Sequence, residues 1–119
     1  MKYSESLKNY FDFQNVYQKG SSKANRILVM YVWENGTNRN RLGISVSKKV
    51  GNSVVRHHLT RLVRESYRLH EEMFNSGLDI VVVARKGASQ VNYHEVESAL
   101  MHLGKLHHIL KEDEADQNM

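Results

Sequence analysis

Apolar and polar residues alternate over residues 41–47, and a helical pattern follows them. The alternation has the period of two that marks a half-buried strand. Residues 48–51 interrupt it, and Asn52 or Ser53 supplies the short polar side chain that caps a helix. The helix is predicted from about residue 53 to about residue 73. Its predicted core face repeats at three- and four-residue steps: Val55, Leu59, Leu62, Leu69 and Met73.

The N-terminal part of the chain contains one helical and one strand-like segment. Residues 1–6 are polar and are predicted to be loose. A short helix is predicted within residues 7–17, ending before Gly20, and residues 20–23 are predicted to form a turn. Residues 26–33 (RILVMYVW) combine branched and aromatic side chains, which predicts a strand.

Three further signals complete the pattern. Residues 34–38 contain an Asn-Gly pair, so the strands before and after this loop are predicted to pair as a hairpin. Residues 78–84 (LDIVVVA) form a nearly continuous apolar run, which predicts a buried strand. Asn92 is predicted to cap a last helix that ends near Leu110. Apolar residues at helical spacing predict the core face of this helix: Val96, Leu100, Leu103 and Leu110.

Three strands and three helices predict an α+β fold, a two-layer sandwich in which helices pack on a small mixed sheet. The strand–helix–strand segment 41–84 matches a βαβ unit, which is almost always right-handed. One domain is predicted over residues 1–111. Residues 112–119 hold four acids and no lysine or arginine, and this acidic tail is predicted to be disordered.

Positive charge is concentrated in one quarter of the chain. The formal net charge is +4, but the acidic tail hides a net charge of +8 over residues 1–111. Residues 39–68 hold eight basic residues against Glu65 alone, and Glu65 is predicted to pair with Arg61 or Arg68. Acids that would alternate with basic residues on an ordinary surface helix are nearly absent, so a polyanion is the predicted partner, with nucleic acid favoured.

The sequence offers no evident catalytic or metal centre. It has no cysteine, no Gly-rich phosphate loop and no paired-carboxylate motif, and Asp12, Glu65 and Asp79 are predicted to be isolated from other catalytic groups. No two of His102, His107 and His108, which lie near one another on the last helix, have the i, i+4 spacing of a helical metal pair, so no metal site is predicted. No apolar run approaches the ~20 residues of a membrane span, and none marks a secretion signal, so a cytoplasmic location is expected.

The run SVSKKVGNSVVRHHLTRLVRESYR resembles the signature of the protein subunit of bacterial ribonuclease P. Further matches lie on either side of it in the family's order: FDFQNVYQKG, ANRILVMYV, DIVVVAR and a closing helix. The resemblance covers about residues 7–110. It implies a ribosomal protein S5 domain 2-like fold, in which the βαβ crossover has the rare left hand.

The resemblance also implies a function. The chain would be the non-catalytic protein subunit of an endoribonuclease that removes the 5′ leader from precursor tRNA, with the catalytic RNA and precursor tRNA as partners. The RNA subunit would carry the active site and bind most of the Mg²⁺, and neither an organic cofactor, a further protein partner nor a membrane is implied. The implied contacts with the catalytic RNA are Lys48, Lys49, Asn52, Arg56, His57, His58, Arg61, Arg64 and Arg68.

An aromatic set forms the second candidate surface. Taken by spacing alone, Phe13, Tyr17 and Tyr31 are more often core residues than ligand contacts. The resemblance instead implies a cleft for the single-stranded leader, whose unstacked bases can stack on aromatic faces. The implied leader-binding residues are Phe13, Tyr17, Val29, Tyr31, Ser45 and Ser47.

The chain departs from the family at the entrance of the basic helix. The usual Arg-Asn-Arg triplet is here Arg56-His57-His58, and the usual Lys-Arg pair is Thr60-Arg61. A histidine carries little charge at neutral pH. Phosphate contact at positions 58 and 60 is therefore expected to be weaker or more dependent on pH.

Two other functions match parts of this pattern. A general or ribosomal RNA-binding module would have the basic helix but no preference for a leader. A self-contained nuclease would cleave precursor tRNA without an RNA subunit, and the missing catalytic cluster disfavours it.

Overall fold

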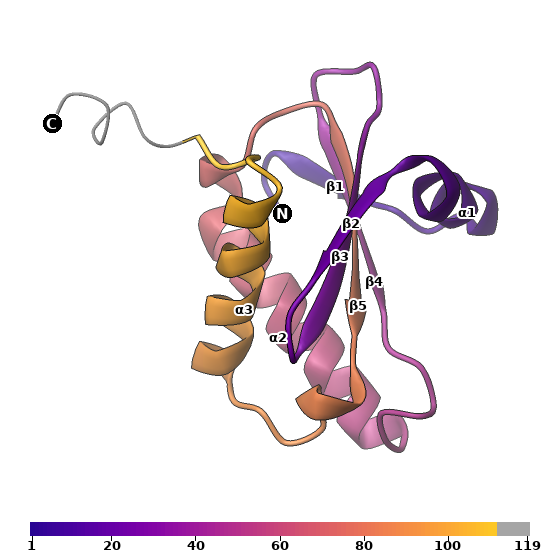
Figure 1. Ribbon diagram of the computed structural model, residues 1–119, viewed down its shortest axis with the longest axis vertical. Helices are drawn as coiled ribbons and strands as arrows, with labels where there is room; N and C mark the ends of the chain where they lie inside the picture. Colours follow the sequence, from indigo (N-terminus) through magenta and orange to yellow (C-terminus); the bar gives the residue numbers. More distant parts are fainter. Residues whose placement is uncertain (112–119) are drawn as a thin grey trace, which may run out of the picture.

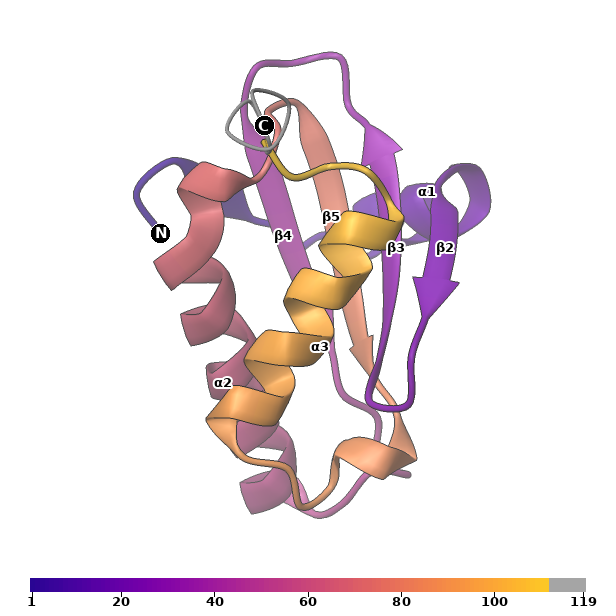
Figure 2. The same ribbon diagram turned by 60° about the vertical axis from the view of Figure 1, so that its left-hand side comes forward.

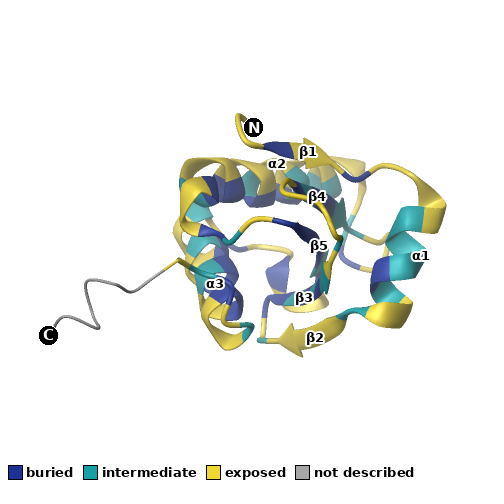
Figure 3. Cartoon of the chain, turned by 90° about the horizontal axis from the view of Figure 1, so that it is seen from above, coloured by how far each residue is buried: buried dark blue, intermediate teal, exposed yellow. Residues whose placement is uncertain are grey.

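The computed structural model describes residues 1–111 as a mixed sheet with helices on both faces (Figure 1). Helices α2 (Ser53–His70) and α3 (Tyr93–Leu106) pack on one face, and α1 (Tyr10–Lys19) crosses the other. Figure 3 shows the buried residues of the helices turned toward the sheet from both sides. The predicted sandwich of helices on a mixed sheet is confirmed, with α1 as a partial additional layer. The predicted acidic tail, residues 112–119, lies outside the described residues.

The sheet has five strands in the order β1–β4–β5–β3–β2. Strand β4 pairs in parallel with β1 and β5, whereas β3 pairs antiparallel with β5 and β2. Two short 3-10 helices follow α2 and β5: η1 (Glu71–Met73) and η2 (Lys86–Ala88). The strands are β1 (Ser4–Ser6), β2 (Ser21–Ala24), β3 (Leu28–Glu34), β4 (Asn40–Ser45) and β5 (Leu78–Ala84).

The predicted hairpin between β3 and β4 is wrong, because β5 lies between them. The loop with the Asn-Gly pair does reverse the chain, but it passes over the start of β5, where the Asn35 amide donates to the Gly77 carbonyl at 2.9 Å. Strand β5 is buried along its whole length except at half-buried Val83. A continuous apolar run of this kind is suited to the centre of a sheet, where helices cover both faces.

Two edge strands lie where no strand was predicted, in residues 1–6 and 20–23. They are short and polar, so they show no apolar alternation, and only pairing with a neighbouring strand gives them their structure. A buried polar cluster holds β1 in place. The hydroxyl group of Tyr67 lies 2.8 Å from Ser4 Oγ, and Asn40 Nδ2 donates to the same hydroxyl at 3.2 Å.

Helix α2 begins after Asn52, whose side chain accepts a hydrogen bond from the Val55 amide. Its buried stripe is narrower than predicted. Leu69 and Met73 are 55% and 45% exposed, because Leu69 lies beyond the edge of the stripe and Met73 belongs to η1 after the helix has ended. The buried residues of α2 are Leu59, Val63, Ser66 and Tyr67.

The other two helices agree with their predicted bounds in part. Helix α1 begins at Tyr10, after the Asn9 cap, and its predicted end before Gly20 is confirmed. The predicted cap of α3 is confirmed, since Asn92 and Glu95 form a reciprocal capping box. This helix ends at Leu106, four residues early. Its predicted core residues Val96, Leu100 and Leu103 are fully buried, whereas Leu110 lies beyond the helix and is half-buried.

The β4–α2–β5 unit has the left-handed crossover that the resemblance implied (Figure 2). Seen with the helices in front, β4 lies to the left of β5, both strands run downward, and α2 rises before them. The usual right-handed rule is therefore broken here. In this view α2 lies on the β4 side of the sheet, whereas α3 lies on the β3 and β2 side.

No helix within residues 1–111 is long and apolar enough to cross a membrane.

Candidate RNA-binding surfaces

The first candidate surface, called the basic surface below, covers the turn after β4 and the outer side of α2. All of its residues are exposed except Arg56, which is half-buried. A hollow of about 270 Å³ is lined by His58, Arg61, Leu62, Arg64 and Glu65. The carboxylate of Glu65 is paired with Arg68, so Arg61 and Arg64 are the lining groups suited to a phosphate. The basic surface consists of Lys48, Lys49, Asn52, Arg56, His57, His58, Arg61, Arg64 and Arg68.

Arg56 and Thr60 are linked within the first turns of α2. The Thr60 hydroxyl donates to the Arg56 carbonyl at 2.9 Å, so this side chain turns back onto its own helix. The Arg56 Nε is buried and has no hydrogen-bond partner among the described residues. A buried donor without an acceptor lowers stability.

Three of the eight basic residues in the stretch 39–68 are paired with carboxylates. Arg68 Nε donates to Glu65 Oε2 at 3.0 Å, which lowers the pKa of Glu65 and confirms one of the two predicted partners. Arg39 lies 3.4 Å from a carboxylate oxygen of Glu5, and Arg41 is also paired with acids. Arg39 and Arg41 belong to the basic quarter of the chain but not to the predicted RNA contacts, and both neutralise acids at the sheet.

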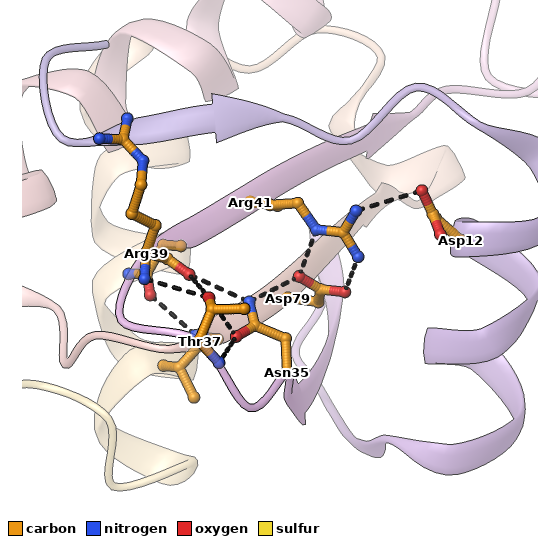
Figure 4. Close-up of polar contacts among 8 residues, drawn as sticks. Asp12, Asn35, Thr37, Arg39, Arg41 and Asp79 are labelled. Atoms are coloured by element: carbon orange, nitrogen blue, oxygen red, sulfur yellow. Dashed lines mark hydrogen bonds and ion pairs between the residues drawn. The ribbon is translucent and has the colours of Figure 1, made fainter.

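A buried ion pair that sequence reasoning missed lies beneath α1 (Figure 4). The Arg41 guanidinium group binds both carboxylate oxygens of Asp79, at 2.8 and 2.6 Å, and reaches Asp12 at 3.2 Å. Asn35 Nδ2 donates to Asp79 at 2.9 Å. The prediction that Asp12 and Asp79 are isolated from each other is wrong, because both pair with Arg41. The sequence did contain a signal for this ion pair. Asp79 is the single charge inside the apolar run 78–84, and a buried carboxylate requires a partner.

The second candidate surface, called the aromatic surface below, lies on the α1 side of the sheet. Strand register places Val29 and Ser45 in one row across the sheet and Tyr31 in the next. Ser47 is exposed just beyond the end of β4. The ring of Tyr17 meets that of Tyr31 edge to face, with centroids 4.9 Å apart. The aromatic surface consists of Phe13, Tyr17, Val29, Tyr31, Ser45 and Ser47.

The aromatic rings serve partly as core. Phe13, Tyr17 and Tyr31 are half-buried and pack around fully buried Val16 and Val81, so the core interpretation holds for part of each ring. Burial raises the pKa of Tyr17, and the neighbouring serine hydroxyl of β4 acts in the opposite direction. The rest of each ring remains accessible to a ligand.

Gly43 on β4 allows the Phe13 ring of α1 to pack closely against the sheet. A Cβ at this position would lie 2.6 Å from the Phe13 ring, so only glycine lets α1 approach β4 so closely.

The two surfaces meet at the loop between β4 and α2, which carries Lys48 and Lys49. Figure 1 shows that α1 crosses only one end of its face of the sheet, and that this loop lies at the other end. The aromatic surface therefore extends from α1 toward the lysines that begin the basic surface. The two surfaces are therefore adjacent on the molecule.

Within residues 1–111, no group of three or more His, Cys, Asp or Glu side chains is placed to hold a metal ion. His107 has a structural contact instead, since its Nε2 lies 2.9 Å from the Met30 carbonyl. Burial lowers the pKa of His107, which favours the neutral ring.

Comparisons with known proteins agree on one family. The family model described as Ribonuclease P matches residues 1–107. The ribonuclease P protein component of Lachnoclostridium phytofermentans is 64% identical over 115 residues, covering 97% of this chain and 99% of that protein. The corresponding protein of Alkaliphilus metalliredigens is 50% identical over 103 residues, covering 87% of this chain and 93% of that protein.

Solved structures agree with this result. The RNase P protein of Staphylococcus aureus matches with a TM-score of 0.84 and 37% identity, covering 91% of this chain and 99% of that one. The RNase P protein of Thermotoga maritima matches with a TM-score of 0.79 and 35% identity, covering 86% of this chain and 96% of that one. By sequence and by fold, the chain belongs to the bacterial ribonuclease P protein family.

Proposed function

We propose that this chain is the protein subunit of ribonuclease P and helps to remove the 5′ leader from precursor tRNA. Its basic surface binds the backbone of the catalytic RNA, and its aromatic surface binds the leader. The observation that carries this proposal is the junction of the two surfaces at Lys48 and Lys49. A protein that binds the enzyme RNA and the substrate side by side increases the affinity of one for the other.

The contacts proposed for each RNA differ in kind. Arginines on a helix face neutralise the regular backbone of a folded RNA. Half-exposed Tyr17 and Tyr31 offer ring faces and edges to unpaired bases, whereas Ser45 and Ser47 offer hydroxyl groups for hydrogen bonds. Stacking of this kind accepts any base, which suits leaders of varied sequence.

The chemistry is assigned to the RNA subunit. Asp12 on α1 and Asp79 on β5, two acids of the sheet face that carries the aromatic surface, are both paired with Arg41. Phosphate and nucleobase oxygens of the catalytic RNA are suitable ligands for Mg²⁺, and the ions are proposed to bind mainly there. Cationic side chains of the protein reduce repulsion between the two RNAs, so less Mg²⁺ is needed for them to associate.

Cleavage assays at low Mg²⁺ test the proposal. Three samples are compared: the protein alone, the catalytic RNA alone, and the two together. We expect rapid cleavage of precursor tRNA only in the mixture, and we expect the advantage over RNA alone to shrink when the leader is trimmed. Cleavage by the protein alone would reveal a nuclease site, whereas no enhancement by the protein would indicate a general RNA-binding module.

RNA affinity is expected to rise a few-fold between pH 8 and pH 6. His57 and His58 are exposed on the basic surface, and histidine gains positive charge as the pH falls through this range. The measurement is the dissociation constant of the complex with the catalytic RNA at both pH values. His58→Arg should bind more tightly at pH 8 and respond less to pH. An unchanged pH response in this variant would show that His58 does not contact phosphate.

A further inference from the structure

Two exposed aromatic side chains begin α1 and belong to neither surface described above. Tyr10 and Phe11 are 68% and 77% exposed, and their rings meet edge to face with centroids 5.6 Å apart. Tyr10 forms no hydrogen bond through its side chain among the contacts of residues 1–111, and its ring packs against Phe11. Adjacent exposed aromatic rings are typical of a binding surface rather than of a core.

The geometry of α1 places Tyr10 on the same side of the helix as Tyr17. The two residues are seven positions apart, which is close to two helical turns, so their side chains leave the helix in nearly the same direction. The opposite side is identified by Asp12, which contacts Arg41. Tyr10 therefore extends the row of rings that Tyr17 and Tyr31 begin, toward the N-terminal end of α1.

The side of α1 that carries Tyr10 is suited to a polyanion. The sheet rows beside it contain uncharged residues, such as Val29 and Ser45, and the helix adds Gln14. Exposed Lys8 lies two residues before Tyr10. Asp12 and Asp79, the carboxylates that pair with Arg41, lie on the side of α1 opposite Tyr10. They therefore do not repel a phosphate chain that runs along the Tyr10 side.

We infer that Tyr10, packed against Phe11, is a further stacking position for the single-stranded leader. This inference rests on the proposed function of the aromatic surface. Seven helical residues span about 10 Å, which is about the length of three stacked nucleotides at ~3.4 Å each. A strand that contacts the rings of Tyr17 and Tyr31 therefore reaches the ring of Tyr10 within a few nucleotides. A tyrosine ring stacks on any base, so this position adds affinity without selecting a sequence.

The test measures the affinity of the reconstituted holoenzyme for precursor tRNAs with leaders of increasing length. Tyr10→Ala is expected to weaken binding about tenfold once the leader is long enough to reach the ring, and to leave binding of leaderless tRNA unchanged. Tyr10→Phe keeps the ring and should restore the affinity. Tyr3→Ala removes a tyrosine that is 49% exposed on β1's side of the molecule and serves as the matched control.

Tyr31→Ala separates this inference from the proposed function. If Tyr31→Ala reduces leader-dependent affinity and Tyr10→Ala does not, Tyr10 does not contact the leader, and the proposal that the aromatic surface binds the leader is kept. If neither variant has an effect, the aromatic surface does not bind the leader. If Tyr10→Ala weakens the binding of leaderless tRNA equally, Tyr10 and Phe11 contact the catalytic RNA or the tRNA body instead, and the inference is overturned.

Discussion

Replacing Arg41 with methionine is expected to lower the free energy of unfolding by about 3–5 kcal/mol. Asp79 is completely buried in β5 and accepts two hydrogen bonds from Arg41, at 2.8 and 2.6 Å. Without the guanidinium group, the carboxylate keeps a single side-chain donor, Asn35. A buried charge that loses its counterion costs far more than the pair contributes when intact. Urea denaturation of both proteins measures the difference.

Two variants isolate the cause of this loss. Arg41→Met combined with Asp79→Asn removes the stranded charge and should be more stable than Arg41→Met alone. Arg39→Met breaks the pair with Glu5, whose two side chains are 51% and 59% exposed, and should cost less than about 1 kcal/mol. Equal losses for Arg39→Met and Arg41→Met would mean that burial of the pair is not the source of its importance.

Replacing Arg61 and Arg64 together with glutamine is expected to weaken binding to the catalytic RNA about 100-fold, or about tenfold for each arginine. Both side chains are exposed beside His58 and have no carboxylate partner among the described ion pairs. Neither contributes to the core, so the fold should be unaffected. Each lost phosphate contact should also reduce the slope of log affinity against log salt concentration by about 0.7 to 0.9.

Controls for this experiment come from the same chain. Lys23 and Lys105 are exposed on β2, which lies at the sheet edge three strands away from β4, and near the end of α3, and their double replacement by glutamine removes the same charge. This control should bind the RNA with little change. Arg68→Gln should have a smaller effect than Arg64→Gln, because Arg68 already binds Glu65. Similar losses of RNA affinity in the control and the test variant would show that net charge, rather than the position of Arg61 and Arg64, determines binding.

Local patterns in the chain were sufficient to predict several elements closely. The predicted strand 78–84 coincides with β5, and the predicted start of the basic helix coincides with α2 after the Asn52 cap. The cap of α3 at Asn92 was also predicted. These features depend on hydrogen bonds and apolar periodicity within a few residues, so the information lies in the segment itself.

Pairing between distant segments was not predictable in this way. Nothing in the loop between β3 and β4 indicates that β5 will enter between them, because the choice depends on which strand can be buried on both faces. The edge strands β1 and β2 carry no pattern of their own. The pairing of Arg41 with Asp79 joins residues 38 positions apart, so no local pattern indicated it.

By itself, the sequence determined the family, the basic face of α2, and the segments that form helices and strands. Each of these depends on a motif, a charge pattern or a periodicity that lies within one short segment. Only the tertiary structure decided the strand order, which charges are free and which are paired, and where the aromatic rings lie relative to Lys48 and Lys49. These properties arise when the apolar faces of the sheet and helices are buried together, because burial brings distant side chains into contact and requires each buried charge to find a partner.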